Sequence, residues 1–139
     1  MAQQAETAEE FGEKTIMVHA MMLMCYIDQK MAPQELATIE SYAKALPEFY
    51  GRNFQDYYEA AKRLASRADG SIDCAVGALS DIKSEILRRR TYYCALELAF
   101  ADGLVEAEEK LLVTVREALG IPPELADDMR RVIGMKFSV

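Results

Sequence analysis

Residues 93–120, YCALELAFADGLVEAEEKLLVTVREALG, contain the pattern that decides the fold. Apolar residues at helical spacing lead into a short corner at residues 101–103, and a second helical pattern runs from there to Gly120. Asp102 lies in the corner, and Glu109 follows it by seven residues. This order predicts a helical hairpin with one carboxylate at its corner and another at the start of its second helix.

A weaker copy of the same pattern lies 74 residues earlier in the chain. There Asp28 ends an apolar run, and Glu35 follows it by seven residues. The offset between the two copies is the same for both acids, since 102 − 28 and 109 − 35 are both 74. Apolar positions align at the same offset: Met22 with Leu96, Met24 with Leu98, Met31 with Val105, and Ile39 with Val113. The repeat predicts two related, pseudo-symmetric helical hairpins.

Composition favours one all-α domain over residues 1–139. Of the 139 residues 51% are hydrophobic, and only seven Gly and four Pro interrupt the good helix formers that dominate the chain. We expect a compact bundle of about seven helices, with residues 1–6 as a frayed tail. Local signals place helices at about residues 7–27, 33–46, 53–65, 72–79, 81–101, 107–119 and 123–133. The expected caps are a Thr7–Glu10 capping box, Asn53, Ser71 and Gly120.

Charge and cysteine content narrow the function classes. The formal net charge of −7 opposes binding to nucleic acids, which are polyanions. The three cysteines, Cys25, Cys74 and Cys94, form no disulfide framework and are expected to be reduced, buried side chains of a cytoplasmic protein. The N-terminus is polar and acidic, so no signal peptide is expected. The longest apolar run, residues 16–27, is shorter than the ~20 residues that cross a membrane.

The corner acids have two explanations. As local caps, each Asp pins its turn and each Glu, at the third position of the following helix, bonds back to free N–H groups. Alternatively the two corners meet, and four clustered carboxylates then require a cation. Oxygen ligands suit Ca²⁺, Mg²⁺ or Mn²⁺. The candidate metal ligands are Asp28, Glu35, Asp102 and Glu109.

Other features also allow two interpretations. The aromatic residues of segment 47–58 are expected to fill a small core, with a partner-binding patch as the alternative. Basic residues at 83 and 88–90 either balance nearby acids or contact phosphate. His19 and the methionines around it lie on an apolar helix and are expected in the core. Glu97 lies between two leucines, and if half-buried it needs a partner.

The sequence around the second corner resembles that of the tellurite-resistance TerB-like family. The resemblance rests on residues 100–109, FADGLVEAEE, on the later ALGI at 118–121, and more weakly on residues 26–35, YIDQKMAPQE. It extends over nearly the whole chain in helix order and spacing. It implies an all-helical fold of two hairpins, a link to tellurite and other stresses, and an acidic metal site at Asp28, Glu35, Asp102 and Glu109. Gln29 replaces the corner glycine in the first copy. The family has no established catalytic residues to carry over.

Three functions follow as hypotheses. The first is a non-catalytic, cytoplasmic TerB-like domain that acts in stress resistance through an acidic patch that binds a divalent cation or a partner. The second is a protein-interaction module without metal, whose acids serve only as caps. The third is a metal-dependent hydrolase, although the chain has no phosphate-binding glycine loop or nucleophile motif. Protein partners are expected, a second copy of the chain among them, and the sequence does not decide the cation.

Overall fold

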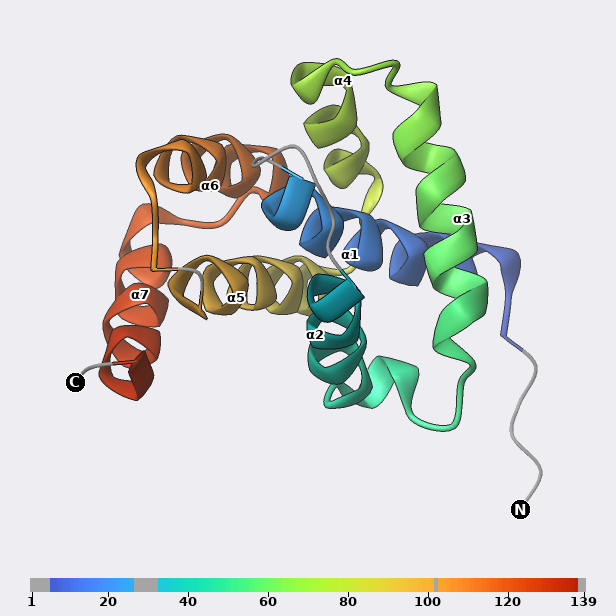
Figure 1. Cartoon of the computed structure of the whole chain (residues 1–139), viewed down its shortest axis with the longest axis horizontal. Helices are drawn as coiled ribbons and strands as arrows, with labels where there is room; N and C mark the ends of the chain where they lie inside the picture. Colours follow the sequence, from blue (N-terminus) through green and yellow to red (C-terminus); the bar gives the residue numbers. More distant parts are fainter. Residues whose placement is uncertain (1–5, 27–32, 102, 138–139) are drawn as a thin grey trace.

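The first helix, α1 (Ala8–Tyr26), lies at the centre of the computed structural model, which describes residues 6–26, 33–101 and 103–137 (Figure 1). It contacts α2, α3, α5 and α6, so apolar side chains all round its circumference are covered. The residues shielded completely include His19, Met17, Val18, Ala20, Met21 and Met22. The methionines therefore fill the core, as expected.

Six further helices follow α1 in the described part of the chain. They are α2 (Pro33–Lys44), α3 (Phe54–Arg67), α4 (Ile72–Gly77), α5 (Glu85–Ala101), α6 (Glu106–Leu119) and α7 (Pro123–Phe137), with short 3-10 turns η1 (Pro47–Phe49) and η2 (Ala78–Asp81). Helix α3 packs along one side of α1 and α5 along another, while α6 and α7 pack on α5 (Figure 1). The described ranges contain no strand, and the predicted all-α bundle is confirmed.

The helix bounds follow the sequence repeat. Shifted by 74 residues, the end of α1 falls on residue 100, and α5 ends at Ala101. The same shift places α2 on residues 107–118, and α6 spans Glu106–Leu119. Two pairs of helices of similar length, 19 and 12 residues against 17 and 14, are therefore related by the repeat, and their first helices, α1 and α5, contact each other. Residues 27–32 and 102, which fall in the two corners, lie outside the described residues.

The predicted caps are confirmed. Thr7 Oγ1 accepts the N–H of Glu10 at 3.1 Å while Glu10 Oε1 accepts the N–H of Thr7 at 3.2 Å, which is a capping box. Asn53 and Ser71 cap α3 and α4 through their side chains. Gly120 ends α6 with a φ of +67°, in the left-handed region that favours glycine.

The structure differs from the sequence prediction at the start of α5. That helix begins at Glu85 rather than near residue 81, because residues 78–81 form η2 and Ile82 is extended and fully buried. Ser84 then acts as a cap, since its Oγ accepts the N–H of Leu87 at 3.4 Å. Burial of Ile82 thus moves the helix start beyond the position that local signals favour.

Two buried polar side chains behave as predicted. His19 is fully buried, and its Nε2 lies 2.8 Å from the carbonyl oxygen of Ala75. Glu97 is 8% exposed and accepts a hydrogen bond from Lys136 Nζ at 2.8 Å, which joins α5 to α7. This hydrogen bond, with the nearby negative charge, raises the pKa of Lys136.

Two expectations need correction. Cys25 and Cys94 are buried, and burial raises the pKa of the Cys94 thiol to about 12, but Cys74 is exposed near the start of the short helix α4. The expected frayed tail included Glu6, yet both carboxylate oxygens of Glu6 accept hydrogen bonds. Residues 1–5 lie outside the described residues.

Candidate functional site

The second corner shows how one of the predicted metal ligands is placed. Glu109 lies on the first turns of α6, where its Oε1 accepts hydrogen bonds from Arg130 Nη1 at 2.7 Å and Nη2 at 2.5 Å. Arg130 in turn lies over the ring of Phe100, 5.8 Å from its centroid. Glu109 is therefore an ion-pair partner that ties α6 to α7, and a cation at this carboxylate would have to compete with Arg130.

The other three candidate ligands fall outside what the structure describes. Asp28 and Asp102 lie in the corners, and although the backbone of Glu35 is part of α2, its side chain is not described. Among the side chains that are described, no group of three or more His, Cys, Asp or Glu is placed to hold a metal ion. Convergence of the four acids remains a prediction.

Capping at the second corner falls on a different acid from the one predicted. Because α6 begins at Glu106, its third residue is Glu108, and Glu108 Oε1 accepts the N–H of Val105 at 3.1 Å. Glu108 is fully buried, whereas Glu109 is half-buried and points to α7. The corner itself is left-handed, with φ of +89° at Gly103, as expected, and +53° at Leu104.

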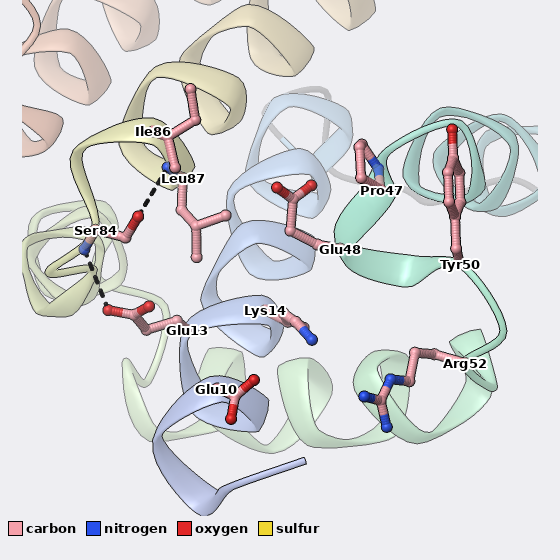
Figure 2. A pocket seen from close by; sticks show the side chains of 10 residues that line it. All are labelled: Glu10, Glu13, Lys14, Pro47, Glu48, Tyr50, Arg52, Ser84, Ile86 and Leu87. Carbon is pink, nitrogen blue, oxygen red and sulfur yellow. Dashed lines mark hydrogen bonds between the residues drawn. The ribbon is translucent and has the colours of Figure 1, made fainter. Parts of the chain in front are cut away.

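A cleft of about 510 Å³ lies on another part of the molecule, between α1, the loop around η1 and the start of α5 (Figure 2). We call it the polar cleft. Its lining residues are Glu10, Glu13, Lys14, Pro47, Glu48, Tyr50, Arg52, Ser84, Ile86 and Leu87. Its volume is within the range of small-ligand sites and of anchor pockets for a partner's side chain.

The polar groups of the cleft hold the fold together around it. Glu13 Oε1 accepts hydrogen bonds from the N–H groups of Lys83 at 2.7 Å and of Ser84 at 3.4 Å (Figure 2). A side chain of α1 therefore binds the free backbone N–H groups at the N-terminal end of α5. Glu48 forms an ion pair with Arg90, one of the basic residues of α5. Its other oxygen, Oε2, is buried and accepts no hydrogen bond from the described residues, so the charge of Glu48 depends on Arg90.

Charges of both signs line the cleft. Hydrogen bonds from Thr7 hold the pKa of Glu10 below its usual value, and the positive charges of Lys14 and Arg52 add to this effect. Glu10 and Arg52 thus give the lining of the cleft a carboxylate and a guanidinium.

Two large apolar side chains flank the cleft. Tyr50 is 61% exposed and Ile86 is 53% exposed, and Figure 2 shows them on opposite sides of the opening. Three other aromatic residues of the segment, Phe49, Phe54 and Tyr57, are buried as expected, and Tyr58 is partly buried against the core. The sequence prediction of a small aromatic core is confirmed for these three, and Tyr50 is the most exposed residue of the five.

Sequence reasoning missed the polar cleft because its members come from three distant segments and form no motif. One signal was available. Lys14 stands directly before the apolar run of α1, and a charge placed there must be buried with a partner. The basic residues of α5 were a second signal for buried or paired charge, because they were expected to balance nearby acids. Arg89 does pair with Glu85, and Arg90 pairs with Glu48 of the cleft.

Comparison of the chain with protein-family models, with curated proteins and with solved structures finds no match. Within the ranges described, no helix is both long and apolar enough to cross a membrane.

Proposed function

We propose that this protein is a non-catalytic binding domain of the TerB-like type, and that it binds a protein partner at the polar cleft. The observation that carries the proposal is the pair of exposed apolar side chains, Tyr50 and Ile86, on either side of a cleft lined with charges. Tyrosine is among the residues that most often dominate the energy of an interface, and clefts receive the anchor side chains of partners.

The contacts within the cleft favour binding over catalysis. Glu13 caps the start of α5, Glu48 pairs with Arg90 and Lys14 pairs with Glu6. A general acid or base exchanges a proton with its substrate and needs a pKa near the working pH. Side chains committed to a helix end or an ion pair suit a rigid recognition surface better.

The cellular role that we propose follows the family resemblance. The domain would act in the cytoplasm, in a complex that protects against tellurite or a related stress. Tellurite is an oxyanion and the protein carries a formal net charge of −7, so an indirect role is physically more reasonable than direct binding. The raised pKa of the Cys94 thiol, which keeps it protonated and unreactive, suits a structural cysteine in a reducing compartment.

Capture of partners with three forms of the protein tests the proposal. The wild type, Tyr50→Ala/Ile86→Ser and the control Val113→Ser/Val132→Ser are immobilised and exposed to an extract of the source cells. The control removes exposed apolar side chains from α6 and α7 instead, since Val113 is 53% and Val132 is 50% exposed. Loss of an anchor costs about 2 kcal/mol, so at least one captured protein should fall by about tenfold or more with the cleft variant alone.

The proposal fails if the three forms capture the same proteins in the same amounts. It also fails if the control variant loses the partner as fully as the cleft variant does. Circular dichroism of each variant, compared with wild type, confirms that the fold is retained.

A further inference from the structure

A carboxylate is bound between α1 and α3 by donors from both helices. Glu6 lies just before α1; its Oε1 is 2.6 Å from Lys14 Nζ, and its Oε2 accepts a hydrogen bond from the Tyr57 hydroxyl, also at 2.6 Å. Lys14 belongs to α1 and Tyr57 to α3. One ammonium and one phenol from separate helices thus converge on the two oxygens of a single carboxylate, which is the geometry of a carboxylate-binding site.

Both donors are withdrawn from water. The side chain of Lys14 is 10% exposed and Tyr57 is 2% exposed. A buried ammonium is costly unless an anion pairs with it, so this position requires a negative group. Burial and the hydrogen bond to Glu6 raise the pKa of Tyr57, which keeps its hydroxyl a proton donor.

Aromatic packing fixes the phenol in place. The ring of Phe11 stacks on Tyr57 with centroids 4.9 Å apart, and the ring of Phe49 meets it edge-on at 5.2 Å. Arg52 adds positive potential, since its charge opposes the rise in the pKa of Tyr57 and lowers the pKa of Glu10. The Tyr57 ring is therefore held in place by contacts that do not involve Glu6.

We propose that Lys14 and Tyr57 form a carboxylate-binding site that Glu6 occupies as a tethered ligand, and that a carboxylate from another molecule can take its place. Glu6 precedes the hydrogen-bonded ladder of α1, whose first bond joins Phe11 N–H to the carbonyl of Thr7. Exchange of the ligand therefore leaves the helix intact. The site shares Lys14 with the lining of the polar cleft but contains neither Tyr50 nor Ile86, and the proposal does not rest on partner binding at those two residues.

The tether makes Glu6 a competitor. Because Glu6 belongs to the same chain as its donors, it acts at an effective concentration in the millimolar range or above. An external carboxylate can bind only while Glu6 is out of the site. Its apparent dissociation constant is therefore the intrinsic constant divided by the fraction of time that the site is empty. We expect Glu6→Ala to bind a carboxylate at least about tenfold more tightly than the wild type does.

Thermal unfolding in sodium acetate tests the site, with sodium chloride at equal ionic strength as the reference. The proteins are wild type, Glu6→Ala, Glu6→Ala/Tyr57→Phe and the control Glu9→Ala, which removes an exposed acid from the first turn of α1. Acetate at ten times its dissociation constant should raise the midpoint of Glu6→Ala by about 4 °C relative to chloride. Wild type, Glu9→Ala and the double variant should respond much less.

Two results overturn the proposal. One is a midpoint of Glu6→Ala that is the same in acetate and chloride. The other is an equal rise in all four proteins, which means that acetate acts through the solvent. Tyr57→Phe retains the ring and its packing and removes only the hydroxyl, so loss of the acetate response in the double variant reports the hydrogen bond.

A second titration identifies the source of the carboxylate. Glu6→Ala is titrated with acetate and with a short peptide whose ends are blocked and whose one charged residue is an internal glutamate, and binding is followed by the NMR signals of the Tyr57 ring. Saturable binding of either ligand supports the site, and the tighter one tells whether a small acid or an acidic peptide fits it better. Tyr50→Ala/Ile86→Ser in the Glu6→Ala background should leave these affinities unchanged, which separates this site from the proposed function.

Discussion

Single polar side chains inside the helical core each hold a distant part of the chain. Tyr57 of α3 donates to Glu6, which Lys14 also binds, and His19 of α1 lies in hydrogen-bond contact with the carbonyl of Ala75 in α4. Each is nearly or fully buried, so each group depends on its partner for the hydrogen bond that water would otherwise supply. Substitutions at these positions should affect stability more than those of the many exposed charges.

His19 gives the protein a pH dependence of known sign. Burial lowers the pKa of His19, so the unfolded chain binds more protons than the folded one below an unfolded pKa of about 6.5. The contribution of neutral His19 to the free energy of unfolding is at its full value above that pH. As the pH falls from 7.5 to 5.5, the free energy of unfolding should decrease by about 1 kcal/mol. Denaturant unfolding at the two pH values measures the loss.

The control for this prediction is His19→Gln, which keeps a donor for the Ala75 carbonyl and does not titrate. Since the chain has one histidine, the acids account for all the pH dependence that remains in the variant over this range. The variant should lose about 1 kcal/mol less than wild type between the two pH values. Equal losses in the two proteins would show that His19 is not responsible.

Helix ends are the elements that the sequence specifies most directly. The Thr7–Glu10 capping box, Asn53, Ser71 and Gly120 each lie where their residue types predict. These interactions join residues within one turn, so they do not depend on how the helices pack. The start of α5 is the exception, because burial of Ile82 overrides the local signals.

Two glycines allow a matched test of this local control. Gly120 has a φ of +67° at the end of α6, while Gly12 lies inside α1, and a Cβ at either position meets no atom within 4 Å. Alanine at residue 120 should therefore destabilise by about 1 kcal/mol through backbone strain alone. Alanine at residue 12 should stabilise by about 0.5–1 kcal/mol, because alanine is the better helix former.

Thermal or urea unfolding of Gly120→Ala and Gly12→Ala beside wild type measures both effects. The two midpoints should move in opposite directions. If Gly12→Ala also melts below wild type, something other than helix propensity limits α1, and the local account of that helix is wrong.

The whole molecule decides whether the two corners act together. The repeat of helix bounds places the corner acids at equivalent positions in the two hairpins, but Glu109 is bound by Arg130 of α7, a helix that follows both hairpins. A cation at the corners would have to be strong enough to draw Glu109 from this ion pair, or bind to the remaining acids.

The cation hypothesis predicts a clear thermal shift in the metal-stripped protein. A cation at about 100 times its dissociation constant should stabilise wild type by roughly 2.7 kcal/mol, which is a rise of several degrees in the midpoint. Ca²⁺, Mg²⁺ and Mn²⁺ are tested separately. Asp28→Asn/Asp102→Asn should abolish the rise, and Arg130→Met, which releases Glu109, should make the affinity higher.

If no cation moves the wild-type midpoint and Asp28→Asn/Asp102→Asn simply melts lower, the acids act as caps. The protein-interaction function then accounts for the chain without a metal.

The sequence by itself determined the helices, their order and most of the core. Apolar residues at helical spacing, caps and corner glycines act over one or two turns, so each stretch specifies its own helix. The 74-residue repeat predicted the two hairpins, and the apolar run of α1 predicted a central helix. His19 was expected to be buried because it lies among apolar neighbours, and Glu97, between two leucines, was expected to need a partner if half-buried.

Only the tertiary structure decided which charges meet. The ion pair of Glu109 with Arg130 spans 21 residues, the hydrogen bond of Glu13 to Lys83 spans 70, and that of Tyr57 to Glu6 spans 51. Even the choice of Glu108 over Glu109 as the cap depended on a one-residue difference in where α6 begins. The physical reason is that a helix fixes the positions of side chains along its own axis, whereas the distance between side chains on two helices depends on how those helices cross and pack.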